Sequence, residues 1–250
     1  MSKKTKNRTK RKTKKGKSKN KDEAIHIRLA LYVFNSRKKT KKNKKRNRLS
    51  KSIRRINGYN ILVDINDPLL DGYIEDKKLS TKDNGVYVNQ KDKHVVFSVR
   101  GTDVFESFKD LYYDLKIVLG SEIKTKYYKR SYNLFKKVIQ KYKGYKITLT
   151  GYSLGGRIVI NLLDSDLGEN IDKVYAFNPA TFINQIRKSK LCSEGKSIQC
   201  GNRDNLNIYL VNGDIISSLA EDELAGKHKV FKKHKKSLFN HDAYTFYLKL

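Results

Sequence analysis

Apolar residues recur along the chain in short blocks with two different spacings. Continuous apolar and β-branched runs are typical of buried strands. They cover residues 59–65, 86–88, 95–99, 147–150, 173–177 and 207–211. Blocks with helical spacing lie before and between them, over residues 22–34, 127–142 and 157–163. At 250 residues the chain is long enough for these elements to form one α/β domain with a sizeable core.

Polar residues and glycines predict where some of these elements begin and end. Asp22 and Glu23 place acids in the first turn of the first helix, as the helix dipole favours. Gly144 predicts the end of the middle helix, and the pair Asn84-Gly85 predicts a turn.

The most informative stretch joins the strand over residues 147–150 to the helix over residues 157–163. It reads Gly151-Tyr152-Ser153-Leu154-Gly155, which fits Gly-x-Ser-x-Gly. In a sharp strand-to-helix turn this pattern lifts the serine hydroxyl out of the sheet, where a base can reach it. The two glycines remove Cβ atoms that would clash in the turn, and Gly156 lets the helix pack close to the strand. Ser153 is therefore a candidate nucleophile; the alternative is a glycine-rich turn with an incidental serine.

A second polar segment, Arg100-Gly101-Thr102, follows a predicted central strand. Open α/β sheets place their active sites at the carboxyl ends of strands. The N–H of Leu154, at the start of its helix, would point at an oxyanion formed on an attacked carbonyl, and Thr102 could add its N–H and hydroxyl. Residues 103–110 mix apolar and polar positions, which fits either a lid over the site or an ordinary surface helix.

A serine nucleophile needs a base within hydrogen-bond reach and an anion that holds the base in place. Asp214 comes shortly after the strand over residues 207–211 and is the favoured anion. Glu221 and Asp222 are the alternatives, and both lie deeper in a polar loop.

Three histidines follow Asp214 and are candidates for the base. His228 and His234 stand among lysines, so we expect them to be solvated, and the neighbouring cations disfavour an imidazolium. His241 follows the sequence Leu238-Phe239-Asn240, which indicates an approach to the core. His241 is therefore the favoured base.

Taken together, these segments resemble the class 3 lipase family of α/β-hydrolases over roughly residues 22–250. The resemblance is carried, in chain order, by Val95–Thr102, Asp110–Leu115, Thr148–Gly156, Tyr175–Pro179, Val211–Ile216 and His241–Tyr244. It implies an α/β-hydrolase fold, with a mostly parallel central sheet and flanking helices. It also assigns the nucleophile to Ser153, the orienting acid to Asp214, the base to His241 and the oxyanion hole to Thr102 and Leu154.

Three positions depart from the family pattern. Leu111 stands where the family usually has tryptophan, Ile215 where it has proline, and Tyr152 where histidine is commoner. None of these changes removes a catalytic group. The resemblance implies that the chain cleaves carboxylic esters of tri- or diacylglycerols or of phospholipids, through an acyl-enzyme and with no metal or cofactor.

The formal net charge of +31 is concentrated near the N-terminus, because residues 1–55 contain 25 of the 56 Lys and Arg residues and only two acids. Residues 1–21 lack apolar residues after Met1, so we expect a disordered basic tail ahead of a domain over residues 22–250. Residues 37–55 are a second basic stretch, expected as an exposed loop or frayed helix. Both stretches could bind nucleic acid or an anionic membrane. A catalytically inactive, hydrolase-like scaffold that binds such a partner is the alternative function.

The sequence has no secretory leader, and no apolar run reaches the ~18 residues that a transmembrane helix needs. We therefore expect an intracellular or virion-associated protein. Cys192 and Cys200 lie in one polar loop, where free thiols in a reducing compartment are the expectation.

Overall fold

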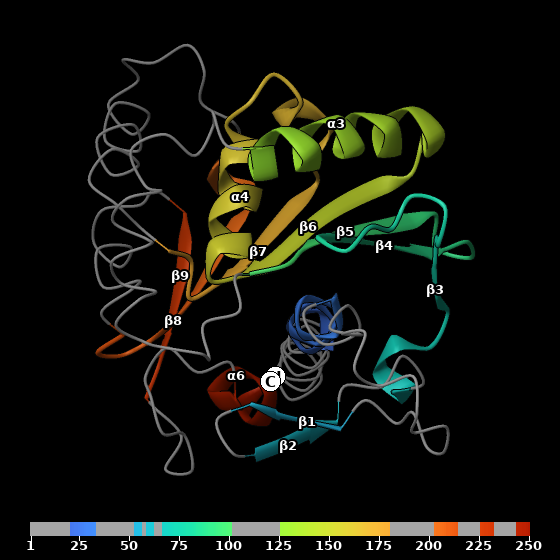
Figure 1. Cartoon of the computed structure of the whole chain (residues 1–250). Helices are drawn as coiled ribbons and strands as arrows, with labels where there is room; N and C mark the ends of the chain where they lie inside the picture. Colours follow the sequence, from blue (N-terminus) through green and yellow to red (C-terminus); the bar gives the residue numbers. More distant parts are fainter. Residues whose placement is uncertain are drawn as a thin grey trace, which may run out of the picture.

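Seven strands of the computed structural model form one sheet, in the order β3-β4-β5-β6-β7-β8-β9 (Figure 1). They are β3 (Tyr73–Glu75), β4 (Asn84–Asn89), β5 (His94–Val99), β6 (Lys146–Tyr152), β7 (Lys173–Phe177), β8 (Leu206–Val211) and β9 (Lys227–Phe231). A separate antiparallel pair consists of β1 (Ile53–Ile56) and β2 (Tyr59–Leu62). The structure describes residues 21–33, 53–56, 59–62, 67–101, 126–180, 203–214, 226–232 and 244–250.

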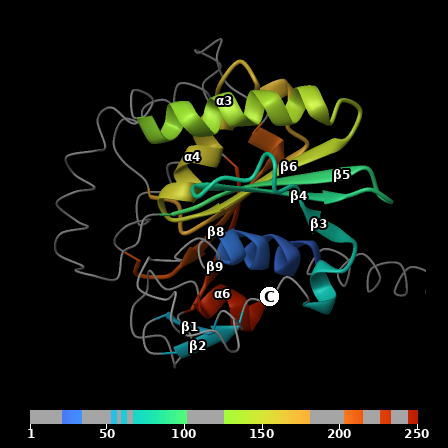
Figure 2. The same ribbon diagram turned by 45° about the vertical axis from the view of Figure 1, so that its right-hand side comes forward.

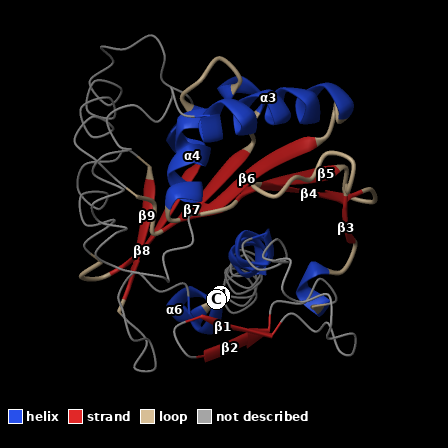
Figure 3. Ribbon diagram, viewed as in Figure 1, coloured by secondary structure: helices blue, strands red, loops and turns tan. Residues whose placement is uncertain are grey.

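Helices cover both faces of the large sheet (Figure 2). α3 (Lys126–Lys141) and α4 (Leu154–Leu163) lie on one face, and a helix over residues 21–33 and α6 (Tyr244–Lys249) lie on the other. Short 3-10 turns are η2 (Pro68–Leu70), η4 (Gly168–Asn170) and η5 (Arg203–Asn205). The helix, sheet and helix layers are distinguished by colour in Figure 3.

The direction of the strands determines where a functional site can form. β5 to β9 are parallel to one another, whereas β3 and β4 add an antiparallel edge. The residues that follow β5, β6, β7 and β8 therefore come together along one side of the sheet, which we call the carboxyl edge. Open α/β sheets bind their ligands at this edge.

The layer between the sheet and helices α3 and α4 is apolar. Every residue of α4 is buried, which agrees with its apolar sequence, since a helix covered all round needs no polar face. α3 instead buries one face, where Phe135 packs against Phe97 with ring centroids 5.2 Å apart. Burying a side chain of this size stabilises the fold by about 1.5–3 kcal/mol.

The opposite layer, beneath the helix over residues 21–33, contains buried polar contacts. The hydroxyls of Thr150 and Ser98 donate to the carbonyl oxygens of His26 and Leu29 at 3.1 and 3.2 Å. These strand hydroxyls would otherwise be buried without partners, which is costly. In the helix over residues 21–33, buried Glu23 accepts a hydrogen bond of 2.7 Å from Lys229, which lies 206 residues later in the chain.

Two histidines extend this polar layer. The ring of buried His26 stacks on Tyr175 with centroids 4.1 Å apart and meets His94 edge-on at 6.2 Å. Burial, followed by the charge of His94, lowers the pKa of His26 well below 6.5. Burial also lowers the pKa of His94, whose ring is hydrogen-bonded to Tyr73 at 2.6 Å and to Thr148 at 2.8 Å. Both imidazoles are therefore neutral near pH 7.

The structure confirms the predicted α/β class, the mostly parallel sheet and the flanking helices. The expected strands over residues 86–88, 95–99, 147–150, 173–177 and 207–211 and the three expected helices are all present within the described residues. The strand expected over residues 59–65 is present as β2, and residues 63–65 lie outside the described part. β3 is a strand that the hydrophobic pattern does not predict, because it is short and only partly buried.

The prediction of a turn at Asn84-Gly85 is wrong, because both residues begin β4 and pair with Val99 and Ser98. The glycine serves a different purpose. A Cβ on Gly85 would lie 2.4 Å from the hydroxyl of Tyr87, so the missing side chain makes room for that ring. Asn84 is buried and accepts a hydrogen bond of 3.0 Å from Ser131 on α3.

The expectation of a loop or frayed helix over residues 37–55 is wrong at its end, because residues 53–55 belong to β1. The basic tail is expected over residues 1–21, but Lys21 is helical. Residues 1–20, the rest of the stretch over residues 37–55, the possible lid over residues 103–110 and both cysteines lie outside the described residues. None of the helices in the described ranges has the length and apolar character needed to cross a bilayer.

We expect the free energy of unfolding to fall as the pH is lowered below 6.5, the ordinary pKa of histidine. The unfolded chain takes up a proton on His26 near that pH whereas the folded chain does not, so acid favours unfolding. His26→Phe keeps a ring against Tyr175 and removes this titration, so it should reduce the fall. Urea titrations at about pH 7.5 and 5.5 measure the difference. A variant that loses as much stability as the wild type would contradict the assignment.

Candidate active site

Ser153 occupies the turn between β6 and α4, with φ 56° and ψ −122°. A positive φ at a residue other than glycine costs roughly 1–3 kcal/mol and persists only where the surroundings enforce it. Here the Ser153 N–H donates to Phe177 O at 3.0 Å, and Ser153 O accepts from Ala180 and Arg157 at 3.1 Å. The expected strand, turn and helix around the serine are thus present.

Glycines permit the close backbone contacts on either side of this turn. A Cβ on Gly151 would lie 2.4 Å from the backbone of Gly155, as expected for a turn this tight. A Cβ on Gly155 would lie 2.1 Å from Val99 O, at the end of β5. The first turn of α4 therefore packs directly against the end of a neighbouring strand, a contact that the motif alone does not indicate.

Gly101 brings the end of β5 beside the serine. A Cβ at this position would lie 2.6 Å from Tyr152 O and 3.5 Å from Ser153 Cβ. Thr102, the next residue, lies outside the described residues, one peptide unit beyond this contact. Leu154 is the first residue of α4 and is buried.

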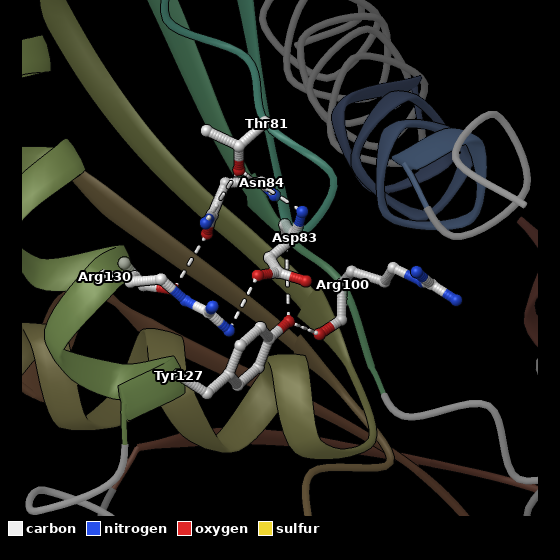
Figure 4. Close-up of polar contacts among 7 residues, drawn as sticks. Thr81, Asp83, Asn84, Arg100, Tyr127 and Arg130 are labelled. Atoms are coloured by element: carbon white, nitrogen blue, oxygen red, sulfur yellow. Dashed lines mark hydrogen bonds and ion pairs between the residues drawn. The ribbon is translucent and has the colours of Figure 1, made fainter.

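Polar contacts between α3 and the sheet hold the end of β5 (Figure 4). The Tyr127 hydroxyl donates to Arg100 O and, at 3.4 Å, to Asp83 O, while Arg100 N–H donates to Asp83 O at 3.0 Å. Arg130 pairs with the Asp83 carboxylate at 3.1 Å. Burial, followed by the nearby Asp83, raises the pKa of Tyr127, so the phenol stays protonated and able to donate. These contacts fix Arg100 and hence Gly101, the residue after it.

Asn178 joins the ends of β7 and β8. Its N–H donates to Tyr209 O at 2.7 Å, and its side-chain oxygen accepts from Val211 N–H at 2.9 Å. The residue is buried and has φ 40°, a conformation that asparagine tolerates better than most residues. Sequence reasoning did not assign Asn178 a role. The available signal was an Asn-Pro pair directly after a buried strand.

Asp214 lies at the carboxyl edge, just past β8. Its N–H donates to Val211 O at 3.1 Å across a turn in which Gly213 has φ 76°. Its side chain is buried, with 2% exposed. The alternatives for the acid, Glu221 and Asp222, lie outside the described residues.

The strands that precede Ser153 and Asp214 lie close together in the sheet. The two residues follow β6 and β8, which lie two positions apart in the sheet, or roughly 10 Å. A hydrogen bond on each ring nitrogen spans about 2.6–3.2 Å, so a ring with two such bonds covers most of that distance.

His228 does not occupy that position. His228 is on β9, where it pairs with Ile208 of β8. β9 lies three positions from β6 in the sheet, roughly 14 Å away. His228 is also half-buried in the strand, whereas its lysine-rich context predicts a solvated side chain. His234 and His241 lie outside the described residues.

The segment after His241 is fixed close to the carboxyl edge. α6 begins at Tyr244, three residues after the histidine, and a chain of that length spans at most about 11 Å. Phe246 of α6 is fully buried against Phe177 and Phe231, with ring centroids 5.5 and 5.6 Å apart. Phe177 is the residue whose carbonyl holds the Ser153 turn.

The structure thus brings Ser153, Leu154 and Asp214 to one edge of the sheet, while Thr102 and His241 lie outside the described residues. Within the described ranges, no group of three or more His, Cys, Asp or Glu side chains is placed to hold a metal ion. The arrangement suits chemistry at a serine hydroxyl.

Comparison with known proteins identifies one family whose model matches more than half of the chain. The family model described as Lipase (class 3) matches residues 79–218. The chain is similar to the Lip2 lipase from Yarrowia lipolytica, at 16% identity over 83% of this chain and 76% of that one, with a TM-score of 0.47. It is also similar to a mutant form of MDLA from Penicillium cyclopium, at 13% identity over 89% and 83%, with a TM-score of 0.44. No curated protein matches the chain.

We expect Gly155→Ala to prevent stable folding or to cost several kcal/mol, because its Cβ would collide with the backbone of β5. Gly144→Ala is the matched control. Nothing lies within 4 Å of the added Cβ there, and only φ +82° opposes the change, so a cost of about 1 kcal/mol is expected. Urea denaturation of both variants measures the difference. Equal losses would mean that the contact between α4 and β5 is not tight.

Proposed function

The chain belongs to the class 3 lipase family, and we propose that it cleaves carboxylic esters of lipids with Ser153 as its nucleophile. The observation that carries the proposal is the strained turn at Ser153, with φ 56°, between a buried parallel strand and the start of a helix. Such a turn presents the hydroxyl at the carboxyl edge, where a base can reach it. Strain of this kind is retained where function requires it.

The proposed reaction forms and hydrolyses an acyl-enzyme. Ser153 Oγ attacks the ester carbonyl carbon while His241 accepts the hydroxyl proton. The resulting imidazolium gives this proton to the departing alcohol as the carbon–oxygen bond breaks. Water, activated by the same imidazole, then attacks the acyl-enzyme and releases the fatty acid and free Ser153.

The oxyanion of each tetrahedral intermediate is proposed to accept hydrogen bonds from the N–H groups of Leu154 and Thr102. Leu154 is the first residue of α4, where N–H groups have no partner within the helix and the dipole favours negative charge. Gly101 lies against Ser153 Cβ, which supports a position for the Thr102 N–H beside the same oxygen. Removing one such donor typically costs about 10²–10³ in kcat.

Asp214 is proposed to orient His241 and to stabilise its charged form. Its burial at the carboxyl edge, two strands from Ser153, supports this role. The packing of Phe246 against Phe177 supports the return of His241 to that edge. The proposed substrates are acyl esters of glycerol or of phospholipids, and profiling tri- and diacylglycerols against phospholipids would distinguish these classes.

We expect Ser153→Ala to lower kcat for a short soluble acyl ester by on the order of 10⁴ or more. The same variant should lose covalent labelling by a fluorophosphonate probe, because no activated hydroxyl remains. Ser165→Ala is the control, since that hydroxyl donates to Leu162 O after α4, away from the turn. Wild-type hydrolysis by Ser153→Ala would refute the proposal.

We expect His241→Ala to lower kcat by a similar factor and His228→Ala to leave it within about twofold, because β9 holds His228 three strands from β6. Hydrolysis of the same short ester by the two variants, prepared side by side, measures this. Full activity of His241→Ala would move the base elsewhere, with His234 the next candidate.

A further inference from the structure

α3 presents an outward face made only of cations and amides. Six basic residues of this helix are exposed, and the helix contains no acid. They are Lys126, Lys129, Arg130, Lys136, Lys137 and Lys141, with exposed Asn133 and Gln140 between them. At 3.6 residues per turn these eight positions share an arc of about 140° along a helix about 24 Å long. We call this surface the basic face of α3.

This distribution of charge opposes helix stability. Lys126, Lys129 and Arg130 lie in the first turns, where the helix dipole favours acids and disfavours cations. Lys126 is three and four residues from the other two, and like charges at these spacings repel. Departures of this kind from the local rules of helix stability are expected at functional sites.

Few of these charges are neutralised within the protein. Arg130 pairs with Asp83 and Lys141 with Asp76. No ion pair joins Lys129, Lys136 or Lys137 to any residue that the structure describes. The excess of positive charge is concentrated on α3. Residues 56–250 as a whole contain 31 basic and 23 acidic residues, whereas α3 contains six basic residues and no acid.

The basic face of α3 begins beside the candidate active site. The hydroxyl of Tyr127, in the first turn, holds Arg100 next to Gly101 (Figure 4). From there α3 runs along the outside of the sheet, as Figure 1 shows. The first turns of this face, with Lys126, Lys129 and Arg130, therefore lie nearest the carboxyl edge, and its last turn lies toward the opposite edge, where β6 begins.

We propose that the basic face of α3 docks the protein on an anionic phospholipid surface, an inference that rests on the proposed function because it supplies the reason for meeting lipid. Lysine side chains on one face attract such a surface without specific geometry. Single-stranded nucleic acid fits less well, because single strands bind through stacking on exposed aromatic rings. The aromatic residues of α3 instead face the protein: Tyr128 and Phe135 are buried, and Tyr132 bonds Asp166 at 2.8 Å.

The test measures the chemical reactivity of individual lysines in the full-length chain. Total binding would not suffice, because the basic residues in 1–55 would also bind vesicles. Ser153→Ala protein, which cannot consume the lipid, is acetylated with an amine-reactive reagent and analysed by mass spectrometry. Vesicles that contain phosphatidylserine should reduce acetylation of Lys129, Lys136 and Lys137 several-fold, and pure phosphatidylcholine vesicles should not. Lys91 and Lys249, which are exposed on other elements, should keep their reactivity.

A matched pair of variants tests the energetics. Replacing Lys129, Lys136 and Lys137 by Gln should weaken binding to the phosphatidylserine vesicles on the order of fivefold for each lysine. The same change at exposed Lys91, Lys232 and Lys249 should weaken binding far less. Both triple variants made with Ser153 intact should hydrolyse a short soluble ester at the wild-type rate.

Three outcomes would overturn the proposal: unchanged acetylation of the α3 lysines, equal losses in the two triple variants, or protection of these lysines by RNA or duplex DNA but not by vesicles. A separate result would refute the proposed function: a wild-type protein that hydrolyses no ester. Binding and footprinting do not depend on that activity, so the two failures are distinguishable.

Discussion

The candidate site depends on the close approach of three backbone segments without side chains between them. The end of β5, the turn after β6 and the first residues of α4 meet where Gly101, Gly151 and Gly155 leave no Cβ atoms. A methyl group at any of these positions would fall within 2.6 Å of backbone atoms. The strained conformation of Ser153 follows from this packing, because the chain has no room for another path from strand to helix.

Side-chain hydrogen bonds and an ion pair hold the ends of the strands around these three backbone segments. Tyr127 and Arg130 hold the end of β5, and Asn178 ties the end of β7 to β8. Half-buried Tyr127 and buried Asn178 bond to backbone atoms, and exposed Arg130 pairs with the Asp83 carboxylate. The positions of the nucleophile and of the proposed orienting acid are therefore set by rigid strands and not by their loops, which is the arrangement that precise catalytic geometry requires.

Sequence reasoning predicted the strands and helices wherever hydrophobic periodicity was strong, and it located Ser153 through the glycine motif. It misread Asn84-Gly85, because a turn signal and a glycine that makes room for Tyr87 look alike in one dimension. It also gave no role to Asn178 or to the contact between Gly155 and β5, since both depend on which strands become neighbours. All five site assignments are proposals, and His241 and Thr102 also lie outside the residues that the structure describes.

The hydrogen bond between Glu23 and Lys229 has a consequence for biogenesis. The helix over residues 21–33 leaves the ribosome early, yet it packs against strands completed about 200 residues later. Its apolar side chains, such as Ile27 and Leu31, therefore stay uncovered while the intervening segments are translated. Contacts this distant along the chain slow folding and prolong the time for which such a surface is exposed to aggregation.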